Sequence, residues 1–295
     1  MTNQDCLITG DEYLKSHPDF KLIGRKEAME NLGGILMRKQ SNSILMVGAG
    51  GSGCSALCMG FQALKDDPDA SFDMISKRKF WLDTDNLFSS GNPEVIRTTF
   101  NKVLGTLAQT PESVLIIDDM HDFIIAATNN GCSNLVNALM RDVKAKKFQA
   151  ILEVREENLD LVIKCHSDMR ELFTMMDVSE PVNGELLEIV KKASGRLEKF
   201  HGIGISSEAI ETAIEVTNKY RARDASLSRA QPERALTLLD RALTKYRQDA
   251  HAKDPEISEI ERRLQKINEA MSGKANGNNE YKVWSKETLE TEKAT

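Results

Sequence analysis

The stretch Ile44-Leu45-Met46-Val47-Gly48-Ala49-Gly50-Gly51-Ser52-Gly53-Cys54-Ser55 decides the fold. Its four leading apolar residues predict a buried strand, its glycines predict a tight turn, and residues 56–64 continue with a helical pattern. Glycines let the backbone curl so that successive N–H groups and the helix N-terminus face an anion. Strand, turn and helix in this order are typical of a phosphate-binding loop.

One position of this loop departs from the G-x-x-x-x-G-K-[ST] pattern. Gly48, Gly53 and the hydroxyl residue Ser55 are present, but Cys54 stands where the lysine is expected. That lysine contacts the β- and γ-phosphates, and a neutral thiol supplies no such charge. Its loss costs about 2–3 kcal/mol, the range for a hydrogen bond to a charged group. The loop therefore predicts weak nucleotide binding without turnover; a glycine-rich turn that binds nothing is the alternative.

A second motif is the apolar strand candidate at 113–117 together with the paired acids Asp118-Asp119 that follow it. In proteins with a phosphate-binding loop of this type, the first acid organises Mg²⁺ and the second position polarises the attacking water. Asp119 replaces the commoner Glu and is one methylene shorter, so a water placed for Glu would sit badly.

Hydrophobic patterns divide the chain into five regions. Apolar runs alternate with helical patterns up to Pro181 and predict a parallel sheet covered by helices, with strands at 43–47, 80–82, 113–117, 148–154 and 172–178. Beyond Pro181 only helical spacing occurs, at 186–200, 207–219 and 232–247. We expect an arm with one helical turn near Tyr13 (1–20), a large α/β subdomain (21–181), a small helical bundle (182–249), a terminal helix (250–271) and a disordered tail (272–295). The terminal helix is predicted either to form a short coiled coil with a partner or to dock on its own domain.

Charge and cysteine usage exclude several classes of protein. A net charge of -6 argues against a duplex-DNA binder, because phosphate neutralisation needs an excess of Lys and Arg. No stretch is apolar enough to span a membrane, and acids near the start argue against a signal peptide, so we expect a cytoplasmic protein. Five cysteines without a CxxC pair fit reduced thiols and favour no metal site.

Together these motifs resemble the first ATPase module of the AAA+ Clp disaggregase and unfoldase family. The similarity starts at Leu22-Ile23-Gly24-Arg25, like the motif beside the adenine in that family, and ends near Arg247. Ile117-Asp118-Asp119-Met120-His121 is close to the family's I-D-E-x-H, and Pro232-Glu233-Arg234-Ala235 is similar to the P-D-K-A of its sensor-2 helix. The resemblance implies a P-loop AAA+ fold, a three-layer parallel sheet with a small C-terminal helical lid domain.

Several functional positions of that family differ here. Val154-Arg155 replaces the polar sensor-1 residue, and only Arg170 is available where paired arginine fingers are expected. The stretch 89–93, at the pore-loop position, has no aromatic residue to grip a polypeptide. Because lysine, catalytic acid, sensor, finger and grip all differ, the resemblance implies a module that keeps its shape and gives up hydrolysis and threading.

The resemblance also assigns residues to an ATP or ADP site with Mg²⁺. Asp119 would be a degenerate catalytic acid, and Ser55 and Asp118 would hold Mg²⁺ if a nucleotide binds. The expected nucleotide-binding residues are Ile23, Gly48, Gly51, Ser52, Gly53, Cys54, Ser55, Ala56 and Arg234. For Arg234, a salt bridge with a neighbouring carboxylate is the alternative to a phosphate contact.

Three functions follow, with different partners. The first is a structural or regulatory subunit of a larger protein assembly, with other AAA+ subunits or a secretion or transfer apparatus as the setting; the N-terminal domain and second ring of Clp unfoldases are not expected. The second is an active or partner-activated ATPase that remodels proteins, with Arg155, Arg170, Arg234 or a partner's basic residue supplying the missing charge. The third, nucleic-acid handling, finds only scattered Lys and Arg.

Overall fold

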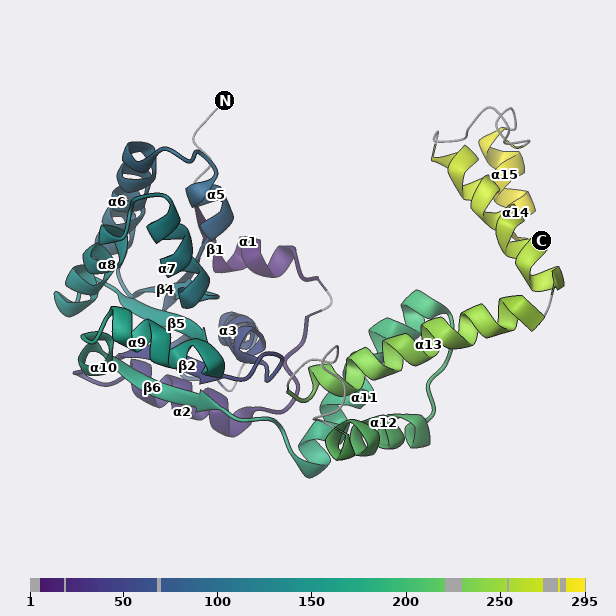
Figure 1. Cartoon of the computed structure of the whole chain (residues 1–295), viewed down its shortest axis with the longest axis horizontal. Coiled ribbons are helices and arrows are strands. Elements are labelled where there is room, and N and C mark those ends of the chain that lie inside the picture. Colours follow the sequence, from purple (N-terminus) through teal and green to yellow (C-terminus); the bar gives the residue numbers. More distant parts are fainter. Residues whose placement is uncertain are drawn as a thin grey trace. The chain divides into compact units, whose positions relative to one another are not determined.

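A computed structural model describes residues 6–18, 20–67, 70–220, 230–253, 255–272, 281 and 285–294. Residues 7–178 contain a six-stranded sheet in the order β1-β3-β4-β5-β2-β6 (Figure 1). The strands are β1 (Leu7–Thr9), β2 (Ser43–Gly48), β3 (Arg78–Leu82), β4 (Ser113–Ile117), β5 (Gln149–Arg155) and β6 (Phe173–Val178).

The predicted α/β class is confirmed, and five strands lie within two residues of their predicted bounds. These five strands pair in parallel. The sequence missed β1, which pairs antiparallel with the edge strand β3 through Leu7 opposite Leu82 and Thr9 opposite Phe80. The sheet is therefore mostly parallel rather than wholly so, and part of the predicted arm belongs to it.

Two apolar clusters, one on each face of the sheet, make three layers. Alternate residues of a strand point to opposite faces, so Leu45 and Val47 of β2 join one cluster while Ile44 and Met46 join the other. One face is covered by α1 (Gly10–Lys15), α2 (Lys26–Leu36), α3 (Cys54–Ala63) and α4 (Phe72–Ile75). The other is covered by α5 (Thr84–Phe88), α6 (Pro93–Gln109), α7 (Met120–Asn129), α8 (Asn134–Lys144), α9 (Leu159–Cys165) and α10 (Met169–Leu172). Short 3-10 turns lie at Leu64–Asp66 and Glu156–Asn158.

Among the described residues, the elements that follow the sheet are helical. They are α11 (Asn183–His201), α12 (Ser207–Lys219), α13 (Glu233–Lys253), α14 (Pro255–Met271) and α15 (Lys286–Ala294). The first four correspond to the helices expected from the apolar spacing. Helix α15 and the buried Tyr281, which packs on Ile267 of α14, lie in the tail expected to be disordered at 272–295; residues 273–280, 282–284 and 295 of that tail lie outside the described residues.

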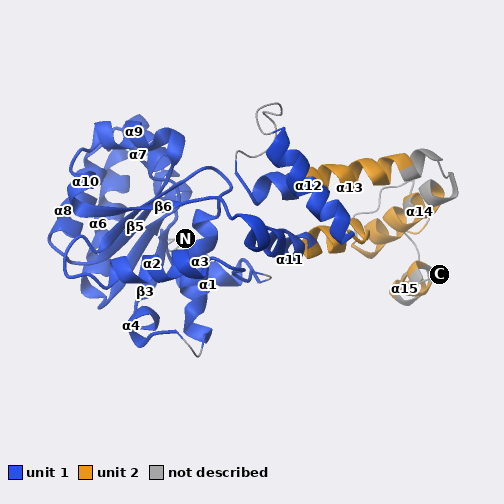
Figure 2. Ribbon diagram, turned by 90° about the horizontal axis from the view of Figure 1, so that it is seen from below, with its two compact units in different colours: residues 1–194, 206–237 blue, residues 195–205, 238–295 orange. Residues whose placement is uncertain are grey.

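Contacts divide the chain into two compact units (Figure 2). Unit 1 holds residues 1–194 and 206–237, and unit 2 holds residues 195–205 and 238–295. The division runs inside α11 and α13, so it does not coincide with the boundary expected at residue 181. The functional extent of the small helical subdomain, 182–249, stays a prediction. Among the described residues, no helix combines the length and apolar character needed to cross a membrane.

Candidate functional site

The predicted phosphate loop connects β2 to α3. Gly51 and Gly53 have φ values of 87° and 104°, a left-handed backbone that favours glycine. The N–H of Ser52 donates to the carbonyl of Ala49 at 2.9 Å and closes the turn. Helix α3 then starts at Cys54, so the strand, turn and helix stand in the predicted order.

Two side chains of the loop turn back over its first glycine. A Cβ added to Gly48 would stand 2.5 Å from the Ser52 hydroxyl and 2.7 Å from the Cys54 thiol. The Ser52 oxygen and the Cys54 sulfur are 3.7 Å apart, and Ser52 is buried. Burial, followed by the nearby Glu153 carboxyl, raises the pKa of Cys54 to about 11. The thiol is therefore neutral at physiological pH and supplies no charge at the lysine position.

Ser55, the predicted Mg²⁺ ligand of the loop, is bonded to an acid that sequence reasoning missed. Its hydroxyl donates to Oε2 of Glu153 at 2.9 Å. Glu153 is 4% exposed, and its other oxygen has no hydrogen-bond partner among the described atoms. Burial, and then the charge of Asp118, raise the pKa of Glu153 to about 8.

The sheet register explains why Glu153 lies at this site. Ile117 pairs with Leu152, and Asp118 and Glu153 are the next residues of their two parallel strands. Both side chains therefore point to the face that α3 covers. A single acid inside the apolar run 150–154 was the signal in the sequence, but only the register connects it to Ser55.

Asp118, the second predicted Mg²⁺ ligand, accepts a hydrogen bond from the N-terminal segment. The hydroxyl of Tyr13 on α1 donates to Oδ2 of Asp118 at 3.2 Å. The Tyr13 ring stacks on Trp81 of β3, with ring centres 4.4 Å apart and planes 9° apart. Sequence reasoning placed Tyr13 in a helical turn but did not connect it to the site.

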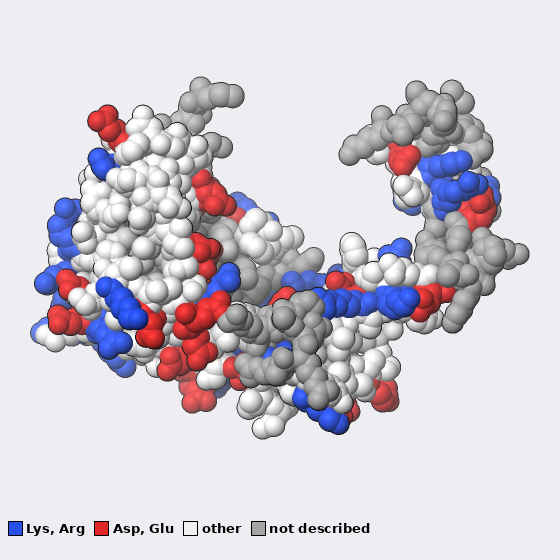
Figure 3. Space-filling view, viewed as in Figure 1, with Lys and Arg blue, Asp and Glu red and all other residues white. Residues whose placement is uncertain are grey.

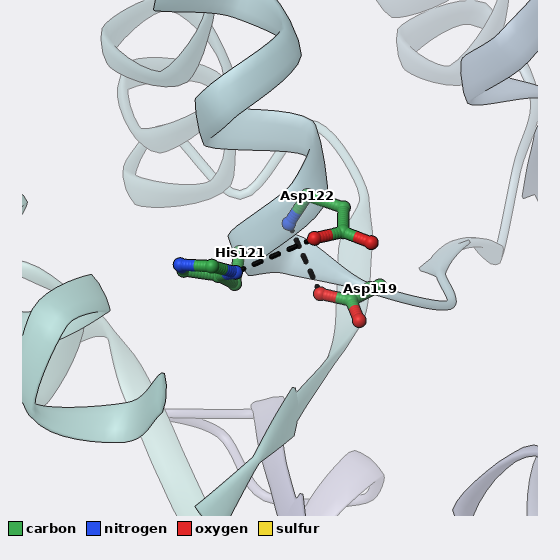
Figure 4. Close-up of side chains that lie close together, drawn as sticks. All are labelled: Asp119, His121 and Asp122. Carbon is green, nitrogen blue, oxygen red and sulfur yellow. Dashed lines mark hydrogen bonds and ion pairs between the residues drawn. The ribbon is translucent and has the colours of Figure 1, made fainter. Parts of the chain in front are cut away.

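Asp119, the predicted degenerate catalytic acid, caps helix α7. Its Oδ1 accepts the backbone N–H of Asp122 at 3.0 Å, and its Oδ2 lies 3.4 Å from Nε of Arg155. His121 lies beside it, with Nδ1 3.4 Å from the Asp122 carboxylate (Figure 4). One ligand-type atom of each of Asp119, His121 and Asp122 falls within 4.8 Å of the others. Both oxygens of Asp119 are therefore engaged by groups of the chain itself.

The segment that contains Ile23 contacts the loop through a residue not included in the predicted site. Ile23 is half-buried, and the backbone turns at Gly24 and Arg25, both with positive φ. The Arg25 guanidinium donates to the carbonyl of Ser179 at 2.7 Å and also to the carbonyl of Ser52. The backbone N–H of Arg25 donates to Glu185 at 2.6 Å. Arg25 thus places a positive charge beside the loop, bonded to neutral oxygens.

Arg234 lies at the start of α13 and is 2% exposed. Its Nη2 contacts Glu180 at 3.2 Å and Asn218 at 3.1 Å. For the salt bridge that is the alternative prediction for Arg234, Glu180 is thus the carboxylate partner. A phosphate contact by Arg234 stays a prediction.

Two other compared segments have structural roles or lie at the surface. Asn92, in the stretch compared with the pore loop, caps α6 by accepting the N–H of Glu94 at 2.9 Å, and Pro93 takes the first helical position. Arg170, compared with the arginine finger, is exposed on α10. Ala56 is half-buried in the first turn of α3.

These contacts test whether the residues fit a nucleotide with Mg²⁺. The Ser55 hydroxyl faces a buried carboxyl, the Asp118 carboxylate faces a phenol, and Ser52 and Cys54 cover Gly48. A phosphate needs open N–H groups and a positive charge, and Mg²⁺ needs free oxygen ligands. In this arrangement these side chains do not fit a nucleotide with Mg²⁺.

Comparison with known proteins identifies the wider relationship. A family model described as the AAA lid domain matches residues 183–293, from α11 into α15. The chaperone protein ClpB of Aquifex aeolicus is 25% identical over 249 residues, which are 84% of this chain and 24% of that protein. The ATP-dependent Clp protease ATP-binding subunit ClpC of Staphylococcus aureus is 25% identical over 247 residues, 83% of this chain and 30% of its own. The chain spans less than a third of the length of these relatives.

Solved structures show the same fold. The S. cerevisiae Hsp104-ADP complex has a TM-score of 0.72 at 20% identity and covers 98% of this chain and 40% of that chain. Hsp104 with ATPγS and FITC-casein, in a closed state, has a TM-score of 0.69 at 20% identity over 80% of this chain and 40% of that chain. The phosphate loop, the acidic end of β4, the lid-domain match and the ClpB and ClpC relatives together support a Clp-type AAA+ module.

Proposed function

We propose that this chain is a degenerate Clp-type AAA+ module that acts as a structural or regulatory subunit of a larger protein assembly. ATP or ADP is at most a weak or structural ligand, and hydrolysis is absent. The observation that carries the proposal is the hydrogen bond from Ser55 to the buried Glu153, because it uses the hydroxyl that would hold Mg²⁺. Cytoplasmic localisation is part of the proposal.

The chemistry of phosphoryl transfer explains why these contacts matter. The reaction needs little covalent help from the protein and depends on positioning and on positive charge around the phosphates. Here Cys54 is neutral, and the second acid, Asp119, is engaged by its own helix and by Arg155. The neighbouring Asp118 is an acid, and the Glu153 carboxyl is mostly protonated at neutral pH, so neither supplies the positive charge of the missing lysine. Nucleotide binding is therefore disfavoured, and transition-state stabilisation more so.

Protein partners fit the surface better than nucleic acid does. On the face of unit 1 shown in Figure 3, Lys and Arg lie among Asp and Glu and form no single basic area. The net charge of -6 agrees with this. ClpC is named as an ATP-binding subunit of a protease, and one Hsp104 structure holds casein, so relatives work in protein assemblies or on proteins. Other AAA+ subunits or a secretion or transfer apparatus are the partners we propose.

One observation favours a second function, an active or partner-activated ATPase. Arg25 lies beside the loop, and its guanidinium donates to two neutral carbonyls, while the charge of Glu185 also acts on it. Arg155 and Arg234, by contrast, contact the carboxylates Asp119 and Glu180. If a cation of this chain compensates for Cys54, Arg25 is the best placed of these three.

Calorimetric titration with ADP and ATP in the presence of Mg²⁺ tests the proposal. We expect weak binding by the wild type and at least about tenfold tighter binding by Cys54→Lys, since a charge-assisted contact contributes about 1.5–3 kcal/mol. Cys165→Lys is the matched control, because it adds the same charge at an exposed position of α9. Tight binding by the wild type, unchanged by Cys54→Lys, would contradict the proposed degeneracy.

A pull-down tests the partner part of the proposal. The full chain and a chain lacking residues 255–295 are compared for recovery of the same binding proteins. We expect recovery to fall when α14 and α15 are removed. Equal recovery would show that the C-terminal helices do not carry the partner contacts.

A further inference from the structure

The N-terminal segment 6–15 is fixed along the edge of the sheet. Strand β1 pairs with β3 over three residues, and the N–H of Asp83 extends the pairing by donating to the carbonyl of Cys6 at 2.9 Å. The segment therefore continues the sheet at its edge, and Trp81, opposite Ile8, is the residue on which Tyr13 later stacks.

Helix α1 is held by its N-terminal cap and by contacts with α3. At its start, Thr9 and Glu12 form a capping box, in which each side chain accepts a hydrogen bond from the other residue's backbone N–H. At its outer side, Asp11 accepts a hydrogen bond from Gln62 of α3 at 2.9 Å and forms an ion pair with Lys65. These contacts join α1 to the C-terminal end of α3, the helix whose N-terminus forms the phosphate loop (Figure 1).

This attachment places Tyr13 against the acidic end of β4. The ring is held flat on Trp81, and the hydroxyl reaches Oδ2 of Asp118. The Tyr13 hydroxyl is thereby a hydrogen-bond donor to this carboxylate oxygen. A proton donor and a metal ion compete for the lone pairs of the same carboxylate.

We propose that residues 6–15 form an intramolecular plug of the nucleotide site, in which the Tyr13 hydroxyl occupies the Asp118 carboxylate that a Mg²⁺-bound nucleotide would use. This inference deepens the proposed function and rests on it, since it explains how the module is held in a state without metal. Binding of Mg²⁺ with a nucleotide then requires Tyr13 to leave Asp118, while binding of a nucleotide without metal does not. A partner that draws β1 or α1 away from the sheet would open the site.

The test compares ADP affinity with Mg²⁺ and with EDTA, in the Cys54→Lys background so that binding is measurable. Tyr13→Phe keeps the ring on Trp81 and removes only the hydroxyl. We expect Tyr13→Phe to increase the ratio of the ADP affinity with Mg²⁺ to the ADP affinity with EDTA by about three- to tenfold, the range expected when a donor to a carboxylate is removed. An unchanged ratio, or no ADP binding by the Tyr13→Phe variant, would overturn the plug.

Tyr246→Phe provides the matched control, because it makes the same chemical change at an exposed position on α13. We expect it to leave the ratio unchanged. Since neither affinity depends on hydrolysis, failure of the plug is separate from failure of the proposed loss of turnover.

Hydrogen exchange provides a second measurement that needs no change at Tyr13. In the Cys54→Lys protein, adding Mg²⁺ and ADP is expected to accelerate amide exchange in residues 7–15, while ADP with EDTA leaves it unchanged. Slower or unchanged exchange with Mg²⁺ would contradict the plug.

Discussion

The hydroxyl of Ser55 lies 2.9 Å from Oε2 of Glu153 and donates to it, although the two residues are far apart in sequence. In the family pattern this hydroxyl serves a metal ion, and here it serves a buried acid on the neighbouring strand. The same replacement recurs at Asp118, which accepts from Tyr13, and at Asp119, which caps α7. The candidate site is therefore satisfied from within the chain, and each contact can be tested separately.

Glu153→Gln is expected to stabilise the protein in a pH-dependent way. The folded pKa of Glu153 is about 8 against an ordinary value of 4.5, so between these values the folded chain holds a proton that the unfolded chain has released. The free energy of unfolding of the wild type therefore falls as pH rises from 4.5 to 8. Gln keeps an acceptor for Ser55 without this penalty, and its advantage grows by roughly 4–5 kcal/mol between pH 4.5 and pH 8, at about 1.4 kcal/mol per pKa unit. Urea denaturation at about pH 5, 6.5 and 8 measures the difference in the free energy of unfolding between the variant and the wild type. A difference that does not change with pH would contradict the buried carboxyl.

The stability difference between Lys79→Met and the wild type is expected to change with pH in the direction opposite to that of Glu153→Gln. Lys79 is buried, donates to the carbonyl of Met74 at 2.9 Å and lies over the ring of Phe61. Burial lowers its pKa to about 8, below the ordinary 10.5, so above pH 8 the unfolded chain binds more protons and wild-type stability rises. The advantage of the Met variant should therefore shrink between pH 8 and 10.5. Urea denaturation across this range checks it, and an advantage that grows with pH would refute the lowered pKa.

Arg234→Met is expected to destabilise unit 1 by about 2–4 kcal/mol, because it leaves the partly buried Glu180 without its arginine. Lys245→Met removes an exposed ion pair with Asp249 on the same helix and should cost less than about 0.5 kcal/mol. Thermal unfolding without nucleotide compares the two. Equal, small effects would mean that the Arg234 contact with Glu180 contributes little to folding and would reopen a ligand role.

Alkylation of the five thiols is expected to follow burial and pKa. Cys165 is exposed and should react first with iodoacetamide, whereas Cys6, Cys58 and Cys132 are buried. Cys54 should also react slowly at pH 8, since a pKa of about 11 leaves about one thiol in a thousand ionised. Mass spectrometry of digested samples gives the order. Rapid labelling of Cys54 would show that the loop stabilises a thiolate, contrary to the neutral thiol described above.

The parts of the fold predicted from sequence are those with local patterns. The loop after β2 was predicted because glycines and an apolar strand occur together, and α12 was predicted because its apolar residues repeat at helical spacing. Strand β1 was missed because three residues are too short to show an alternating pattern. Its strand conformation depends on pairing with β3, which is distant in sequence. The sequence therefore predicted the parallel strands and the helices that cover them, but not the antiparallel strand at the edge of the sheet.

The site was predicted as positions, and its contacts were not. Asp118 and Ser55 follow from motifs, but Glu153 stands inside an apolar run and meets Ser55 only through the register of β4, β5 and β2. Tyr13 reaches Asp118 because β1 fixes the direction of α1, which no local pattern encodes. Contacts between residues distant in sequence depend on tertiary packing. These contacts change the interpretation from a site that lacks several functional residues to a site whose remaining polar groups are bonded within the chain.

Phosphate release from ATP in the presence of Mg²⁺ tests the central claim most directly. Wild type, Cys54→Lys and Asp118→Ala are compared under the same conditions. We expect wild-type release to equal that of Asp118→Ala within error, since the lysine is absent and Ser55, Asp118 and Asp119 are engaged by Glu153, Tyr13 and α7. Robust wild-type turnover that disappears in Asp118→Ala would contradict the account.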